Sequence, residues 1–142
     1  YLSPVMDLFN REILSYSISL SPNMKMIDEM LERLFCTREI KKGVIMHSDQ
    51  GALYQSSSYQ KNLADKGIVQ SMSRKATCLD NAVIENFFGL LKSEMFYGKE
   101  FESIEHFTEE LKEYIRYYNE DRIKIKLDGL SPVQYRLTKF AS

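Results

Sequence analysis

Two carboxylates in this sequence, Asp49 and Glu85, have the chemistry to share a metal ion. Asp49 comes just after the apolar run Val44–Met46, which is typical of a buried strand, and Gly51 follows two residues later. Asp and Gly also favour ordinary turns, so a plain turn remains an alternative. If Asp49 and Glu85 lie close together, their repulsion favours a cation between them. Mg²⁺ accepts few carboxylates together with waters and phosphate oxygens, so this pair suits phosphoryl transfer.

Glu85 lies in the segment Asn81–Tyr97, whose apolar spacing predicts a helix. At about 100° per residue, Asn81, Gly89 and Lys92 fall within about 40° of Glu85. The rest of the helix surface is apolar, so one narrow polar strip remains. A solvated strip explains the same pattern. Gly89, however, leaves open space beside Glu85, at a cost of about 1 kcal/mol in helix propensity.

The segments before this helix read as strands and helices in alternation. Tyr1–Phe9 and Arg11–Leu20 are expected to form antiparallel strands joined by a hairpin turn at DLFNR. The next predicted elements are a helix over Ser21–Phe35 with Ser21 as its N-cap and Pro22 as its first residue, a strand at Gly43–Met46, a helix that begins at a serine of SSSYQKNLADKG and ends at Gly67, a strand at Ile68–Met72, and a polar loop at Ser73–Asp80.

From Asn81 onward the pattern is helical, with further helices at Ser103–Glu120 and after Ser131-Pro132. The chain thus begins with strands, continues with alternating strands and helices, and ends with helices. This order is typical of an α/β sheet with helices on its faces. A chain of 142 residues suits one domain with a real core.

Composition narrows the class of protein further. Hydrophobic residues make up 44% and charged residues 27%, and no apolar run is long enough to cross a membrane. The start YLSPVMDLFN lacks the basic and apolar regions of a signal peptide. Cys36 and Cys78 are far apart and predict free thiols in the cytosol, not a zinc site. The net charge of −1 argues against indiscriminate adhesion to nucleic acid but leaves room for a local basic patch.

Three blocks of sequence carry a resemblance to a known family. They are HSDQGALYQS, GIVQSMSRKATCLDNAVIENFFGLLKSE and YIRYYNEDRIKIKLDGLSPVQYR. In this order they resemble the integrase-like DDE catalytic core of bacterial insertion-sequence transposases, over essentially the whole chain. Asp49 and Glu85 leave 35 residues between them, as that family requires. Two departures, Ala76 and Leu79, stand where the family more often has Gly and Tyr.

The resemblance implies a ribonuclease-H-like mixed sheet flanked by helices. It also implies that Asp49 and Glu85 are the second Asp and the Glu of the catalytic triad and bind the metal. The first Asp of the family lies on a strand upstream of the one that matches the start of this chain. Asp7 belongs to the hairpin-turn block and is not assigned to catalysis. Residues 1–142 are therefore expected to be a catalytic core that lacks its first strand and first catalytic Asp.

The same resemblance implies DNA cleavage and strand transfer with two Mg²⁺ or Mn²⁺ ions in the complete enzyme. Lys92 on the strip of Glu85, and Arg74 and Lys75 in the polar loop, are candidate DNA phosphate contacts, although a solvated role explains each of them equally well. The implied partners are transposon ends, target DNA and further copies of the chain, in the bacterial cytoplasm and away from membranes.

Two other functions stay open at this point. One is a nuclease of the same superfamily that hydrolyses DNA without joining it. The other is a non-catalytic DNA-binding or assembly module, which the absent first Asp favours. With two acids in place of three, we expect this fragment to be inactive and to bind Mg²⁺ weakly. His47 precedes Asp49 by two residues, so it either supports the acid or is a partly buried histidine whose ring is satisfied by the backbone.

Overall fold

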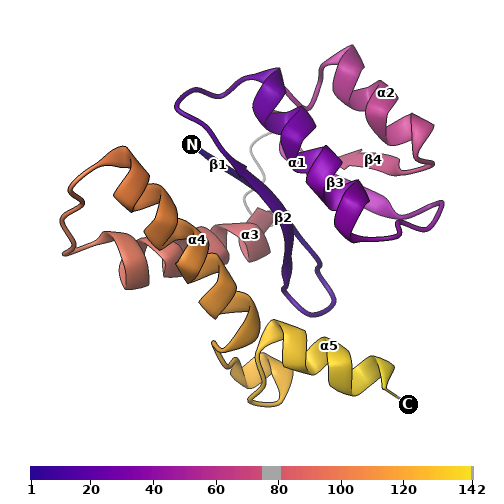
Figure 1. Ribbon diagram of the computed structural model, residues 1–142. Helices are drawn as coiled ribbons and strands as arrows, with labels where there is room; N and C mark the ends of the chain where they lie inside the picture. The colour runs from indigo at the N-terminus through magenta and orange to yellow at the C-terminus, as the bar shows by residue number, and fades with distance from the viewer. Residues whose placement is uncertain (75–80, 142) are drawn as a thin grey trace. The chain divides into compact units, whose positions relative to one another are not determined.

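The computed structural model describes residues 1–74 and 81–141 (Figure 1). The chain divides into two compact units, the first formed by Tyr1–Val5 and Leu14–Glu85, and the second by Met6–Ile13 and Asn86–Ser142. In the described part of the chain, no helix has the length and apolar character that a membrane-spanning helix needs. The prediction of one catalytic-core domain over residues 1–142 stays a prediction.

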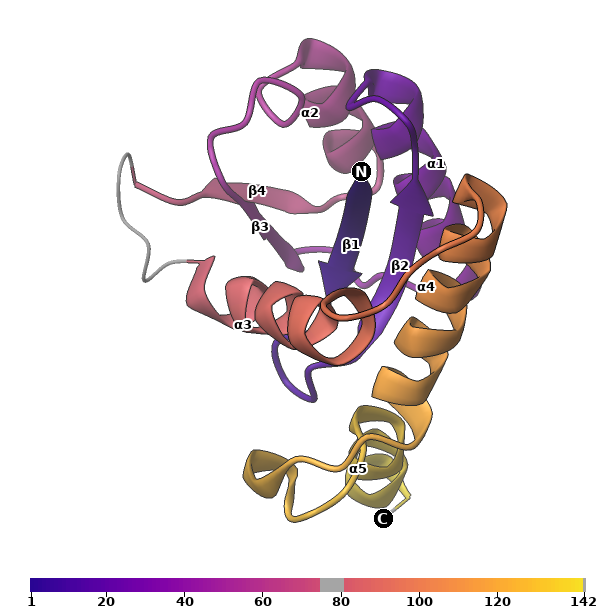
Figure 2. The same cartoon turned by 90° about the vertical axis from the view of Figure 1, so that its left-hand side faces the viewer.

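The first unit holds the strands. Its elements are β1 (Leu2–Met6), β2 (Ile13–Ile18), α1 (Met24–Thr37), β3 (Ile45–Ser48), α2 (Ser57–Asp65), β4 (Val69–Met72) and the start of α3 (Ala82–Leu91). Tyr1 and Ser19 exchange two backbone hydrogen bonds of 2.7 and 3.0 Å, which confirms the antiparallel pairing of β1 and β2. β3 and β4 run parallel, as Figure 2 shows. The α/β class is confirmed, and the described strands form two two-stranded sheets, β1–β2 and β3–β4.

The buried face of β2 is its serine face. Ile13, Ser15 and Ser17 are buried, and their neighbours along the strand are only partly covered. The hydroxyl groups of Ser15 and Ser17 donate to the backbone carbonyls of Met30 and Met26 in α1, each at 2.6 Å. Small side chains with satisfied hydroxyls let α1 approach the strand closely without leaving a buried polar group unpaired.

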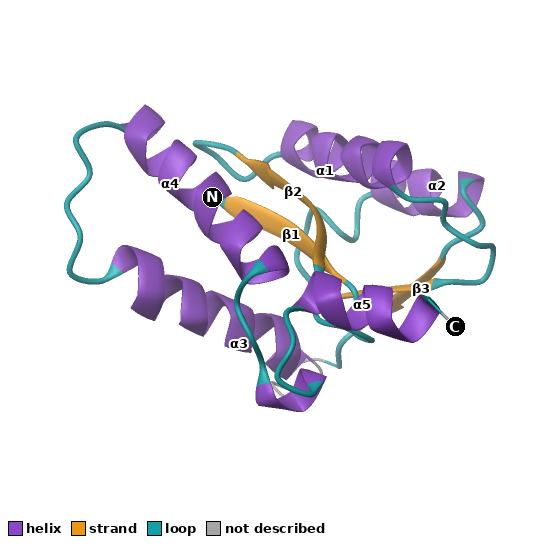
Figure 3. Ribbon diagram, turned by 60° about the horizontal axis from the view of Figure 1, so that its bottom comes forward, coloured by secondary structure: helices purple, strands orange, loops and turns teal. Residues whose placement is uncertain are grey.

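α1 and α2 pack side by side over an apolar core (Figures 1 and 3). The fully buried members of this core come from both helices and from the residue that precedes β4: Ile27, Met30, Leu31, Tyr59, Leu63 and Ile68. Met46 of β3 packs against the same cluster. The core therefore supports β3 from one side only. The expected burial of the run Val44–Met46 is wrong, because Val44 and Ile45 are 43% and 65% exposed.

The helix ends follow the predicted capping chemistry with one correction. Ser56 caps α2 by accepting from the amide of Tyr59 at 3.2 Å, and Gly67, with φ of +69°, follows its C-terminus as predicted. The predicted N-cap Ser21 of α1 is wrong. Asn23 is the cap, because its Oδ1 accepts from the amide of Met26 at 3.0 Å, and Ser21 accepts from the side chain of Asn23 instead.

The second unit is helical. It contains the rest of α3, the π-helical turn η2 (Lys92–Phe96), α4 (Ile104–Glu120), the 3₁₀ turn η3 (Ile125–Leu127) and α5 (Pro132–Phe140). The predicted helix over Asn81–Tyr97 is α-helical only as far as Leu91 and continues as η2. The rings of Phe87 and Tyr118 are fully buried and meet edge to face with centroids 4.9 Å apart, so they pack within the second unit.

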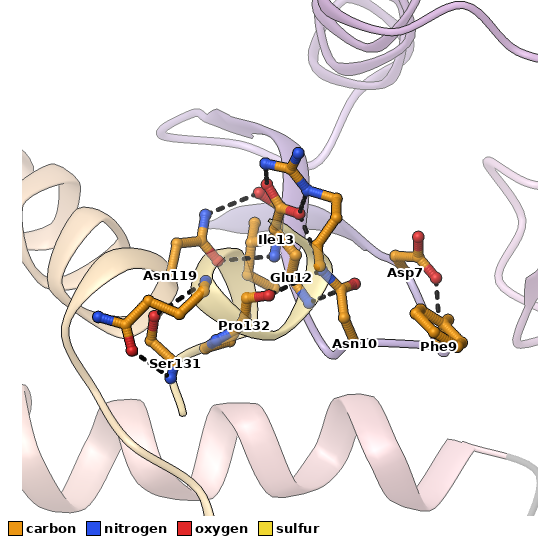
Figure 4. Close-up of polar contacts among 10 residues, drawn as sticks. Asp7, Phe9, Asn10, Glu12, Ile13, Asn119, Ser131 and Pro132 are labelled. Carbon is orange, nitrogen blue, oxygen red and sulfur yellow. Dashed lines mark hydrogen bonds and ion pairs between the residues drawn. The ribbon is translucent and has the colours of Figure 1, made fainter. Parts of the chain in front are cut away.

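The hairpin tip is joined to the C-terminal helices by polar contacts (Figure 4). Asn119 pairs with both backbone groups of Ile13, accepting from its amide at 2.8 Å and donating to its carbonyl at 2.9 Å. Arg136 of α5 donates to the buried carboxylate of Glu12 at 2.7 Å. Asn10 is fully buried and donates to Glu12 and to the carbonyl of Pro132, both at 3.0 Å. These contacts stabilise the second unit.

Asp7 serves the hairpin turn. Its Oδ1 accepts from the amide of Phe9 at 2.8 Å, and the turn closes through the hydrogen bond from the amide of Arg11 to the carbonyl of Asp7 at 2.8 Å. Arg11 takes up a left-handed backbone conformation with φ of 64°. The carboxylate of Asp7 is thus engaged by its own turn.

The YNEDR segment, Tyr118 to Arg122, takes part in a charge pair. Arg122 makes a two-pronged contact with Glu94, with its shortest bond at 2.6 Å, and Tyr114 donates to the same carboxylate at 2.8 Å. The bonds from Arg122 lower the pKa of Glu94 from its ordinary value. The charge of Lys124, whose amine lies 4.4 Å from the ring centroid of Tyr118, acts in the same direction.

Glu94→Gln is expected to lower the free energy of unfolding by about 1–2 kcal/mol at pH 7. Because the folded-state pKa of Glu94 is depressed, its stabilising effect is present above its ordinary pKa and is lost as the pH falls through the folded pKa. The difference between variant and parent should therefore shrink in urea unfolding at pH 3. The exposed Glu39, changed to Gln, is the control. An equal difference at both pH values would contradict the assignment.

Candidate active site

Asp49 is the first residue after β3, and its carboxylate is exposed. Its Oδ1 accepts from the backbone amide of Gly51 at 2.7 Å. A Cβ atom added at Gly51 would lie 2.9 Å from that same oxygen and 3.4 Å from the ring of Tyr54. The strand end is therefore a turn, as Asp and Gly suggest, and the turn also holds the carboxylate of Asp49 in one orientation.

Gly51→Ala is expected to lower any activity that depends on Asp49 by about tenfold or more, because the new methyl group displaces the carboxylate and an error of about 1 Å at a reacting group costs up to about 10² in rate. Rates and urea unfolding are measured on the same preparations of the full-length protein. The control is Ala64→Ser, a change on the exposed side of α2. Gly98→Ala would not serve as a control, because Gly98 has a φ of +76° that a side chain would strain. Unchanged activity with an unchanged fold would show that the orientation of Asp49 is unimportant.

Glu85 is the fourth residue of α3 and is exposed. Phe87 and Leu91 are the buried residues of α3, which agrees with the apolar face predicted from the spacing. Gly89 is exposed, and a Cβ atom added to it would meet no atom within 4 Å. The predicted open space at Gly89 is thus present in the structure.

The chain segments that carry the two acids converge on Ser73. Gln50, the neighbour of Asp49, donates its side-chain amide to the carbonyl of Ser73 at 3.1 Å. Asn81, immediately before α3, donates its side-chain amide to the hydroxyl of Ser73 at 3.0 Å. Sequence reasoning placed Asn81 on the strip of Glu85 and missed Ser73, since a serine that begins a polar loop has no distinguishing local signal.

The two acids form a suitable pair of ligands for a hard cation. Both are exposed, and among the residues that the structure describes neither is paired with a lysine or an arginine. Carboxylate oxygens without a protein cation are the ligands that Mg²⁺ and Mn²⁺ prefer. The described residues contain no group of three or more His, Cys, Asp and Glu side chains that could hold a metal. The assignment of Asp49 and Glu85 as metal ligands stays a prediction.

The other predicted site residues are the three candidate DNA contacts and His47. Arg74 is exposed and directly follows Ser73, while Lys75 lies outside the described residues. Lys92 is exposed and begins η2, beyond the end of α3. The assignment of these three residues to DNA contact stays a prediction. The expected partly buried, backbone-bonded His47 is wrong. His47 is exposed, and its Nδ1 bonds to the hydroxyl of Ser71, its partner on β4, at 2.9 Å.

Comparison with known families identifies the family of this chain. Residues 1–78 match a family model described as an integrase core domain, and residues 85–140 match a second model with the same description. The chain belongs to the integrase core family. The two matches contain Asp49 and Glu85 respectively.

The relatives of this integrase core include insertion-sequence transposases. It is 52% identical over 96% of its length to a putative transposase, InsK of insertion sequence element IS150 from Escherichia coli, and covers 48% of that protein. It is also 52% identical over 96% of its length to a transposase-like protein of Haemophilus influenzae, of which it covers 62%. The integrase core thus spans about half the length of the first of these relatives and under two thirds of the second.

Solved structures confirm the fold of this integrase core. The catalytic core domain of HTLV-2 integrase in complex with magnesium matches 92% of the chain with a TM-score of 0.63 and 14% identity, covering 80% of that domain. The catalytic core domain of BIV integrase matches 89% with a TM-score of 0.65 and 16% identity, covering 81% of that domain. At such identities the likeness establishes the ribonuclease-H-like fold that the resemblance implied, and nothing further about chemistry.

Proposed function

We propose that this chain is the catalytic core of a bacterial DNA transposase that cleaves DNA and transfers strands with a divalent metal. The observation that supports this most strongly is the pair Asp49 and Glu85. Both are exposed carboxylates without a described cationic partner, and the segments that carry them are bonded to the same residue, Ser73. The spacing of the two acids and the membership in the integrase core family support the same reading.

In this proposal Asp49 and Glu85 hold Mg²⁺ or Mn²⁺, with two ions in the complete enzyme. The metal, when bound, supplies charge stabilisation for phosphodiester hydrolysis and for attack by a 3′-hydroxyl. Asp49 and Glu85 would hold the metal, and the turn at Gly51 keeps the carboxylate of Asp49 oriented. The family resemblance implies a third carboxylate in the complete site, and we propose that Asp49 and Glu85 alone do not support cleavage.

DNA contact is proposed for Lys92, Arg74 and Lys75. These contacts go to phosphates and set the position of the DNA without reading its sequence. The partners are transposon ends and target DNA, and the active form is a homo-oligomer in the bacterial cytoplasm. Open space at Gly89 gives a phosphate backbone room to approach α3.

A strand-transfer assay tests the function. The chain over residues 1–142 and a version extended upstream to the length of the relatives are each given a labelled donor end, a target plasmid and Mn²⁺. We expect joined products from the extended version only, and an Asp within an apolar run in the added segment. Hydrolysis without joining would support the nuclease alternative. Binding without any metal-dependent cleavage in the extended version would support the assembly-module alternative.

Mg²⁺ binding by the chain over residues 1–142 is expected to be weak, because two carboxylates compensate less charge than three. Isothermal calorimetry should show binding in the millimolar range, with about tenfold weaker binding again in Asp49→Asn. Asp65→Asn, a change at an exposed acid of α2, is the control. Tight stoichiometric binding would show that a full set of ligands is already present in this chain.

A further inference from the structure

Ser73 is a buried polar junction between the two segments that carry the acids. It is only 4% exposed, directly follows β4, and receives a hydrogen bond on each of its two oxygen atoms. Its amide donates to the carbonyl of Ser48 at 2.8 Å, which extends the pairing of β4 with β3 by one residue. Ser48 is the residue before Asp49. Ser73 is thus fixed to the sheet on one side and bound to Asn81 on the other.

Asn81 connects Ser73 to α3, because it bonds to Ser73 and directly precedes the helix. It lies four residues before Glu85, which is about one helical turn, and falls within about 40° of Glu85 around the helix axis. A contact that holds Asn81 therefore holds the start of α3 on the face that carries Glu85. The bond to Ser73 connects two described residues on either side of positions 75–80, so it sets where α3 begins relative to the end of β4.

Metal binding would depend on where α3 begins relative to the end of β4. Mg²⁺ demands nearly ideal geometry, with ligands at about 2.0–2.1 Å, so two carboxylates serve it only if their backbones keep a fixed spacing. Misplacement of a catalytic group by about 1 Å costs up to about 10² in rate. A neutral hydrogen bond contributes only about 0.5–1.5 kcal/mol to stability. Loss of the contact between Asn81 and Ser73 should therefore affect the site much more than the fold.

We propose that Ser73 and Asn81 are positioning residues that set the spacing between Asp49 and Glu85 for metal binding, with Gln50 fixing the Asp49 side. This inference rests on the proposed function. Neither Ser73 nor Asn81 touches the metal or DNA. They act through the backbone of the strand end and of the first turn of α3.

The test uses the full-length protein and measures the cleavage rate as a function of Mn²⁺ concentration. Asn81→Ala and Ser73→Ala are expected to raise the Mn²⁺ concentration for half-maximal rate about tenfold or more, and saturating Mn²⁺ should restore most of the rate because both carboxylates remain. Ser73→Ala also removes a 3.4 Å hydrogen bond from the Ser73 hydroxyl to the carbonyl of Ser48, so the double variant should be no worse than Ser73→Ala alone. Glu85→Gln, in contrast, should not be rescued by Mn²⁺.

Asn62→Ala is the matched control. Asn62 donates its side-chain amide to the carboxylate of Asp28 at 3.1 Å, a side-chain contact of similar length between α1 and α2. Its Mn²⁺ dependence should equal that of the parent, and urea unfolding should show similar small losses for all three single variants. An equal Mn²⁺ shift in Asn62→Ala would overturn the inference, because the effect would then follow from stability alone.

The outcomes also separate this inference from the proposed function. If Asn81→Ala and Ser73→Ala keep the parental Mn²⁺ dependence while Asp49→Asn and Glu85→Gln lose cleavage, the positioning role is wrong and the metal-dependent function stands. If Glu85→Gln still cleaves at the parental rate, the proposed function is wrong and this inference is overturned with it.

Discussion

Glu85→Gln in the full-length protein is expected to lower DNA cleavage and strand transfer by about 10²–10³-fold or more, because one anionic metal ligand is lost where charge must be stabilised. Glutamine keeps the shape and helix propensity of glutamate. Glu85 is exposed and has no described ion pair, so the free energy of unfolding should change by less than about 0.5 kcal/mol. The measurement is a labelled-end assay in Mn²⁺ together with urea unfolding.

Asp49→Asn should have an effect of the same size, and the double variant should be little worse than either single variant, because the two acids act as a unit. The control is Glu105→Gln, an exposed glutamate in the first turn of α4. A Glu85→Gln protein that retains most of its cleavage, while Glu105→Gln is unaffected, would remove the pair from the mechanism.

Glu12→Ala is expected to lower the free energy of unfolding by about 3–5 kcal/mol, because it removes one partner of a buried ion pair. The side chain of Glu12 is 6% exposed and that of Arg136 is 26% exposed, with 2.7 Å between Oε2 and Nε. The change leaves the guanidinium of Arg136 without this acceptor and takes a partner from the fully buried Asn10. Urea unfolding at pH 7 measures the loss.

Glu113→Ala is the matched control for this prediction. Glu113 and Arg116 form an ion pair at 3.2 Å on the exposed face of α4, with both side chains more than half exposed. Exposed pairs contribute about 0–1 kcal/mol, so the control should lose little stability. Equal losses in the two variants would show that burial of Glu12 has no special effect.

The local elements of this protein follow from its sequence because local structure depends on contacts a few residues away. Ser56 and Ser131 accept from the amides three residues on and begin α2 and α5 where the sequence predicts. The alternation of apolar residues predicts the strands, and the helical spacing around Glu85 predicts which face of α3 is buried. The candidate acids Asp49 and Glu85 were proposed from residue type, position and family resemblance, and their role as metal ligands stays a prediction.

Tertiary structure decided which partners the polar residues take. Arg136 binds Glu12 across 124 positions of sequence, and Ser73 receives Gln50 from 23 positions away, so no local pattern identifies either pair. Packing against α1 selected the serine face of β2 for burial, because the hydroxyls find backbone carbonyls there. Such choices depend on which segments meet in the folded chain. Periodicity and propensity report only what each segment does by itself.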